Sequence, residues 1–181
     1  MRSTLLRTAC TLLLSPLLWP CSAVAQRPIA GTRRIVADSC LPPSEFQLQG
    51  IELHADGGSP ASTLGRPART TITTGEDDGG RYEIQTYHYP ALSIDVVRGM
   101  VDRLMTRSPG VSTPSGLRPG LTFDAANTLL KTKGIVLKQR ADTVDIGTCS
   151  PSSEIILEDY LTLMFDRSGH LQVLELSVAR P

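Results

Sequence analysis

Short runs of alternating apolar and polar residues, separated by turn residues, occupy most of this chain. A period of two is typical of strands with one buried face. Together with the β-branched run at 70–74, these runs predict strands at residues 46–53, 70–74, 82–89, 92–97, 101–105, 135–139, 143–147, 155–165 and 171–179. Arg98-Gly99 and Asp166-Arg167-Ser168-Gly169 have the composition of hairpin turns, so the strands that flank them should pair antiparallel.

Two short helices are expected between these strands. Ser59 has the chemistry of an N-cap, Pro60 suits the first helical position, and Gly65 ends this helix early. A second helix is predicted at residues 123–133, where Thr122 is the N-cap and Gly134 ends the helix. Its apolar face consists of Phe123, Ala126, Leu129 and Leu130.

The first 25 residues have the three parts of a cleavable secretory signal. Arg2 and Arg7 precede a short apolar run, which ends in Ala23-Val24-Ala25. The run is too short to span a bilayer comfortably, and we expect no integral membrane segment in the mature chain. The sequence therefore predicts a periplasmic or secreted protein that is cleaved near Ala25.

The mature chain keeps only two cysteines, Cys40 and Cys149, because Cys10 and Cys21 lie in the signal. Two cysteines in an exported chain are expected to form a disulfide. Cys21 is not expected to carry a lipid, because Trp19 and Pro20 stand where a lipoprotein signal has small residues.

Charge gives no reason to expect nucleic acid as a partner. The formal net charge of the whole chain is zero, with 18 basic and 18 acidic residues. Removal of Arg2 and Arg7 would make the charge −2. Nucleic-acid binding usually requires an excess of basic residues.

The order of turn, short helix and paired strands occurs twice, which predicts two related units. The organisation is a signal at residues 1–25, an N-terminal arm at 26–45, a first repeat at 46–107, a connector at 108–121 and a second repeat at 122–181. A shared Tyr-x-x-Leu-x-(Ile/Phe)-Asp-turn-Gly pattern aligns the repeats, and two unrelated hairpins with similar composition are the alternative. The matched residues are Tyr89, Leu92, Ile94, Asp95 and Gly99 in the first half and Tyr160, Leu163, Phe165, Asp166 and Gly169 in the second.

The segment from Gly116 to Thr122, followed by a short helix and a meander, resembles the beta-lactamase-inhibitor-protein-like (BamE-like) superfamily. The resemblance covers most of residues 46–179 and implies a concave sheet with helices behind it. It also implies that the sheet face binds a partner. The expected fold class is therefore α+β: an antiparallel sheet from two related helix-plus-meander units, with helices on one face.

No catalytic motif is present, and no cofactor or metal site is predicted. His54, His88 and His170 lack metal-ligand spacing to one another or to cysteine. Asp95 and Asp166 could serve as paired catalytic carboxylates, but capping of a hairpin turn is the simpler interpretation of each.

Tyr87, Tyr89 and Tyr160 form the predicted binding surface. Tyr87 and Tyr89 project to one strand face and His88 to the other. If the tyrosine face is open, it provides a contact surface; if it packs under the helices, the rings belong to the core. The leading hypothesis is an exported, non-enzymatic, inhibitor-like module that binds another protein of the cell envelope or exterior. An envelope structural or assembly factor and an exported hydrolase are the alternatives.

Overall fold

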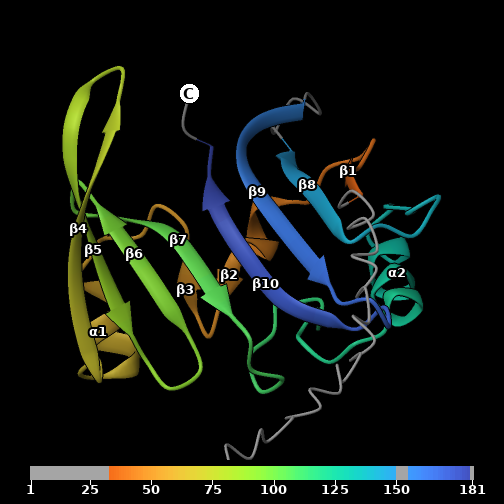
Figure 1. Ribbon diagram of the computed structural model, residues 1–181, viewed down its shortest axis with the longest axis horizontal. Coiled ribbons are helices and arrows are strands. Elements are labelled where there is room, and N and C mark those ends of the chain that lie inside the picture. Colours follow the sequence, from red (N-terminus) through yellow and green to blue (C-terminus); the bar gives the residue numbers. More distant parts are fainter. Residues whose placement is uncertain (1–32, 150–154, 180–181) are drawn as a thin grey trace, which may run out of the picture. The chain divides into compact units, whose positions relative to one another are not determined.

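A computed structural model describes residues 33–149 and 155–179 (Figure 1). An eight-stranded sheet dominates it, with the strand order β1-β8-β9-β10-β7-β6-β5-β4. Its first meander comprises β4 (Arg69–Asp77), β5 (Gly80–His88), β6 (Ser93–Val97) and β7 (Met100–Thr106). The second comprises β8 (Thr143–Cys149), β9 (Ile155–Phe165) and β10 (Leu171–Val178). Antiparallel pairing of β10 with β7 joins the two meanders into one sheet.

One face of the sheet packs on the hydrophobic core. Its alternate residues are fully buried, among them Ile94, Leu104, Val144, Ile146, Leu161, Leu163, Leu174 and Leu176. Helices α1 (Ser59–Leu64) and α2 (Phe123–Lys131) cover only parts of this face. The remainder is covered by connecting segments with the buried residues Leu41, Phe46, Leu48, Ile51, Leu53, Val111, Leu117, Ile135 and Leu137.

The described part of the predicted N-terminal arm contributes a strand to the sheet. β1 (Arg34–Val36) pairs parallel with β8, and the amide of Leu41 donates to the carbonyl of Gly147 at 2.9 Å. The predicted disulfide between Cys40 and Cys149 is confirmed, with 4.9 Å between the Cα atoms. Disulfides are typical of proteins that fold outside the reducing cytoplasm, so this bond is consistent with export.

The expected fold class is wrong. The sheet is mixed rather than antiparallel, because β1 adds to it in parallel. The two helices have only six and nine residues, and loops rather than a helical layer bury much of the core face. The two tyrosines aligned by the proposed repeat also differ in place: Tyr89 lies in the turn before β6, whereas Tyr160 lies within β9.

Two predicted strands also differ from the structure. Residues 46–53 form a hairpin of β2 (Gln47–Leu48) and β3 (Ile51–Glu52), which follows a short 3-10 helix, η1 (Pro43–Glu45). Gln49 and Gly50 have φ values of 52° and 77°, so a two-residue turn breaks the run. Residues 135–139 form no strand, because the backbone of Leu137 bonds to Asn127 of α2 instead.

The helix ends are largely as predicted. Thr122 caps α2, and its hydroxyl accepts a hydrogen bond from the amide of Ala125 at 3.2 Å. In α1 the N-cap is Gly58 rather than Ser59, which is the first helical residue. The predicted hairpin turns at Arg98-Gly99 and at residues 166–169 are both present. The predicted signal at residues 1–25 lies outside the described residues.

Candidate functional site

The face of the sheet opposite the core carries a band of mainly polar side chains. Strand register places the members of each row next to one another, and no described helix covers them (Figure 1). One row contains Gly147, Tyr160, Ser177, Arg103, Asp95 and Thr86. The adjacent row contains Asp145, Thr162, Glu175, Met105, Ser93 and His88. We call this surface the open face.

Arg103 lies at the centre of the open face between two carboxylates. Its Nη1 is 3.1 Å from Oδ2 of Asp95 on β6, and its Nη2 is 3.1 Å from Oε2 of Glu175 on β10. Burial alone would lower the pKa of Arg103, but the charges of Glu175 and Asp95 outweigh it and raise that pKa. The ion pairs therefore fix the guanidinium across three strands.

A second charged group anchors the β1 end of the same face. The side chain of Asp145 on β8 is only 2% exposed and is held by Nε of Arg34 and by the hydroxyl of Thr162. The hydroxyl of Thr162 donates to Oδ1 of Asp145 at 2.8 Å. The hydrogen bond to Asp145 and its charge raise the pKa of Arg34. Arg34 itself is largely exposed, so its cation is presented to solvent from a fixed point.

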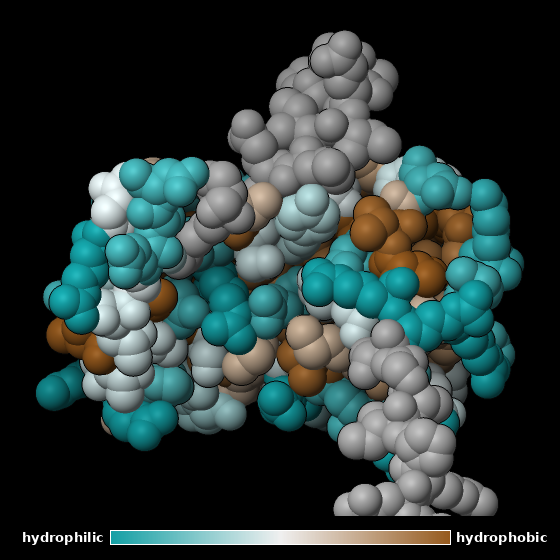
Figure 2. Space-filling model, turned by 45° about the horizontal axis from the view of Figure 1, so that its top comes forward, coloured by the Kyte–Doolittle hydropathy of each residue, from teal (hydrophilic) through white to brown (hydrophobic). Residues whose placement is uncertain are grey.

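A groove of about 490 Å³ runs over β8, β9 and β10 on the open face. It combines one aromatic ring, one thioether, an exposed cation and several hydroxyls. The residues that line it are Arg34, Thr143, Tyr160, Thr162, Met164, Glu175 and Ser177. The surface is mixed rather than uniformly apolar, and Figure 2 shows hydrophobic residues in separate patches among hydrophilic ones.

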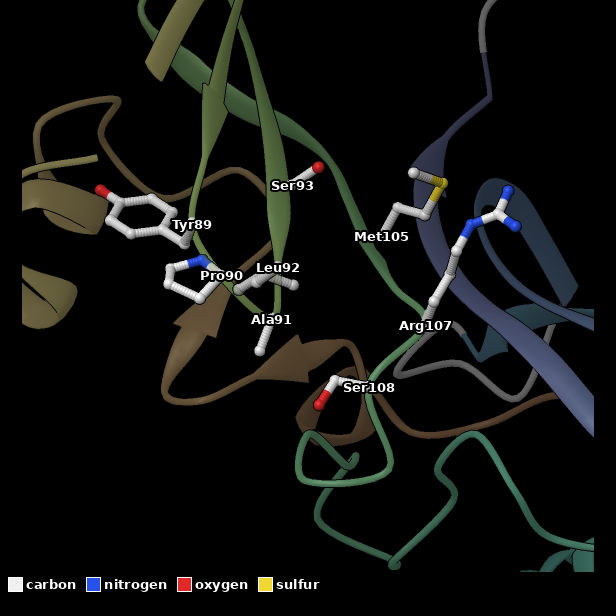
Figure 3. A pocket seen from close by; sticks show the side chains of 8 residues that line it. All are labelled: Tyr89, Pro90, Ala91, Leu92, Ser93, Met105, Arg107 and Ser108. Atoms are coloured by element: carbon white, nitrogen blue, oxygen red, sulfur yellow. The ribbon is translucent and has the colours of Figure 1, made fainter. Parts of the chain in front are cut away.

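A second hollow of about 310 Å³ adjoins the first meander (Figure 3). Ser93 and Met105 contribute to it from the open face, and Arg107 follows β7 at its rim. Met105 lies opposite Glu175 in the β7–β10 pair, so this hollow neighbours the groove through that pair. Figure 3 shows the ring of Tyr89 directed away from Met105 and Arg107.

The structure does not bring the three predicted tyrosines together. Tyr87 and Tyr89 pack against the core, whereas Tyr160 lines the groove on the opposite face. The hydroxyl of Tyr87 donates to Oε1 of Gln85 at 3.1 Å, and that of Tyr89 to the carbonyl of Gly65 at 3.2 Å. Burial raises the pKa of Tyr89. Of the three predicted tyrosines, therefore, only Tyr160 belongs to the open face.

Asp95 and Asp166, which the sequence matched, have different roles. Asp95 lies within β6 and binds Arg103 and the hydroxyl of Thr86. Asp166 stabilises the β9–β10 turn, where its Oδ1 accepts from the amides of Ser168 and His170 at 2.9 Å each. These hydrogen bonds lower the pKa of Asp166. The expected capping role thus fits Asp166 but not Asp95.

The histidines lie in separate local contacts. Nε2 of His54 is 2.8 Å from Oδ1 of Asp159, and Nε2 of His88 is 3.0 Å from Oγ1 of Thr71. Nδ1 of His170 contacts Oγ of Ser168, which also donates to Asp166. In a hydrolytic triad the serine contacts one imidazole nitrogen and the carboxylate contacts the other. Here the carboxylate of Asp166 is bonded to the hydroxyl of Ser168 instead. Within residues 33–149 and 155–179, no group of three or more histidine, cysteine or acidic side chains could hold a metal ion.

Sequence reasoning missed most of the charged residues of the open face. Arg103, Asp145 and Glu175 are polar residues at alternate positions of otherwise apolar strands, which was the available signal. Their partners could not be identified, because Arg103 and Glu175 meet only through the pairing of two non-consecutive strands.

No protein-family model matches this chain, and no curated protein matches it either. The solved structures that are similar to this chain at low identity include three with the following values. An extracellular protein containing a SCP domain from Bacillus anthracis is 14% identical, with a TM-score of 0.44, and the match covers 70% of this chain and 44% of that one. A cysteine-rich secretory protein from Staphylococcus aureus is 12% identical, with a TM-score of 0.47 and coverage of 80% and 50%.

The uncharacterized protein yfeY from Escherichia coli is 11% identical, with a TM-score of 0.44, and the match covers 76% of this chain and 99% of that one. This chain spans about half the length of the first two proteins. TM-scores below 0.5 do not establish a shared fold, so function is inferred from the site alone. The resemblance to the beta-lactamase-inhibitor-protein-like superfamily stays a prediction. Among the described helices, none is long and apolar enough to cross a membrane.

Proposed function

We propose that this chain is an exported, non-enzymatic binding protein that holds another protein of the cell envelope or exterior on its open face. The observation that carries the proposal is the groove over β8, β9 and β10. Its tyrosine, methionine and arginine side chains are of the kinds enriched where proteins meet, and they stand on strands rather than on loops.

Preorganisation supports the same proposal. The cations of Arg34 and Arg103 are held by carboxylates of the same face before any partner arrives. A partner would therefore meet groups whose rotamers are already restricted, which reduces the entropy lost on association. The predicted signal and the disulfide support a periplasmic or secreted location, with cleavage near Ala25.

Photocrosslinking in the intact envelope tests this function. A photoreactive residue at Ser177, within the groove, should capture one dominant protein, which mass spectrometry then identifies. The same residue at Lys131, on α2, is the matched control and should capture none. Equal products at both positions, or none at Ser177 in folded and oxidised protein, would argue against binding through the open face.

Two substitutions refine the test once a partner is identified. Tyr160→Ala and Arg34→Glu should each weaken binding by at least about tenfold, as truncation of interface anchors commonly does. Thr128→Ala, on the exposed side of α2, should leave the affinity unchanged. Wild-type affinity in both groove variants, with normal circular dichroism, would exclude the groove as the contact.

A further inference from the structure

The outer edge of β4 is the longest exposed backbone edge in the described part of the chain. β4 is the last strand of the sheet, and no described strand pairs with its outer side. It has nine residues, most of them exposed, and it pairs with β5 without a bulge. The opposite edge, β1, has only three residues.

β4 also lacks the features that usually protect an edge strand. Natural edges are commonly short, bulged or interrupted by proline or lysine. β4 contains neither of those residues, and its centre is threonine-rich with Ile72 60% exposed. Its charges lie only at the two ends: Arg69 at one, Glu76 and Asp77 at the other. Such a strand is suited to pair with another β-strand.

We propose that a second copy of this chain occupies this edge, with β4 of one copy antiparallel to β4 of the other. The argument is charge complementarity. In a symmetric antiparallel pair of identical strands, residues lie opposite one another about a central residue. With Thr73 at the centre, all nine residues pair and Arg69 lies opposite Asp77 of the second copy.

The same register also places residues that can pack side by side opposite one another at the remaining positions of the two strands. Thr70 lies opposite Glu76 of the second copy, and Ile72 opposite Thr74, so the two isoleucines become diagonal neighbours on one face. Gly75 leaves space for the ring of Tyr82, whose atoms would lie 2.5 Å from a Cβ at that position. Nη2 of Arg98 holds Asp77 at 3.1 Å, which fixes the carboxylate at the end of the edge.

The dimer has a consequence for the open face. A two-fold axis perpendicular to the sheet keeps the same face of both copies on the same side. Thr71 and Thr73 therefore continue the open face into the second copy, and the grooves of both copies open in the same direction. The inference concerns β4 alone and stands whether or not the groove binds a protein.

Light scattering of the oxidised mature chain and cysteine crosslinking test the dimer. The mass should be twice that of one chain and fall to one chain on dilution, and Ile72→Lys should be monomeric with unchanged circular dichroism. Under mild oxidation, Thr73→Cys should form a dimer through its own copy. Thr74→Cys, the matched control, should crosslink far less, because it does not face itself.

A pair of opposite charges tests the register. Thr70→Lys faces Glu76 of the second copy and should tighten the dimer severalfold, whereas Thr70→Glu should weaken it severalfold. A chain that is monomeric at every concentration would overturn the proposal, as would a dimer that Ile72→Lys leaves intact. Crosslinking of Thr73→Cys in the envelope to a different protein, with the purified chain monomeric, would assign the edge to another strand donor instead.

Discussion

Arg103 and Asp95 lie directly opposite each other on β7 and β6, and their side chains form an ion pair of 3.1 Å. The same guanidinium reaches Glu175 on β10, so one side chain connects both meanders across the seam between β7 and β10. Backbone hydrogen bonds pair β7 with β10 at this seam, and leucines of the core lie on the opposite face of the sheet. Arg103 therefore joins the two meanders and, through the same two ion pairs, holds the carboxylates of Asp95 and Glu175 in place on the open face.

Arg103→Met should lower the free energy of unfolding by about 1–2 kcal/mol, because two carboxylates then face each other without a cation. The value is smaller than for a fully buried pair, since Arg103 is partly exposed and solvent screens the charges. Urea denaturation measures it. Arg107→Met, at the exposed residue that follows β7, is the control and should change little. Adding Asp95→Asn and Glu175→Gln to Arg103→Met should recover part of the loss; no recovery would contradict the electrostatic explanation.

Loss of the disulfide should destabilise the fold by up to roughly 4–5 kcal/mol, because the bond closes a loop of 109 residues in the unfolded chain. The double variant Cys40→Ser/Cys149→Ser should unfold at the same urea concentration as the reduced wild type. A reducing agent should not affect the double variant further. A wild-type midpoint that is insensitive to reduction would show that the bond contributes no stability.

Local patterns predicted the hairpins of the sheet, because a turn and its two flanking strands lie together in the sequence. Strands β6, β7, β9 and β10 and both turns were found in this way, and the composition of single runs predicted most of β5 and β8 and the centre of β4. The joins between β7 and β10 and between β1 and β8 are not local, and no short pattern encodes them. The mixed sheet was missed for that reason: the residues of β1 lie in an arm with prolines and glycine on either side.

Much of the site was missed for the same reason. Tyr160 was predicted as a surface residue and lines the groove, but alternation cannot say which face of a strand is buried. The prediction placed Tyr87 and Tyr89 on one strand face and His88 on the other. In the structure the two tyrosines pack against the core. The neighbours of Arg103 follow from pairings that join distant parts of the chain, so its role was visible only in the structure.

Asn127→Ala should release the segment that follows α2 and lower the free energy of unfolding by about 1–2 kcal/mol. The amide side chain of Asn127 donates to the carbonyl of Leu137 at 3.2 Å and accepts from its N–H at 3.0 Å. Hydrogen exchange at the Leu137 amide should therefore accelerate more than exchange in β9 and β10. Thr128→Ala, the next residue of α2, is the control. Unchanged protection of Leu137 would show that these two bonds do not hold the segment.

Glu45 should make the stability of the fold depend on pH in acid. Its carboxylate is 2% exposed, and it contacts Nζ of Lys133 at 2.7 Å and the amide of Ser115 at 3.0 Å. Burial alone would raise the pKa of Glu45, but these hydrogen bonds and the charge of Lys133 outweigh it and lower that pKa below its ordinary value of 4.5. The unfolded chain thus binds the proton more tightly, so stability from Glu45 is present above pH 4.5 and is lost as the pH falls through the lower, folded pKa.

Urea denaturation between pH 6 and pH 3 measures this dependence. Glu45→Gln should be less stable than the wild type at pH 6, because Lys133 loses its partner, and the difference should shrink toward pH 3. Asp38→Asn is the control: its ion pair with Lys138 lies on the surface, with both side chains more than three-quarters exposed, and solvent screens it. A difference between Glu45→Gln and the wild type that stays constant over this range would show that protonation of Glu45 is not linked to folding. The loss at pH 6 would then reflect packing of the side chain rather than its charge.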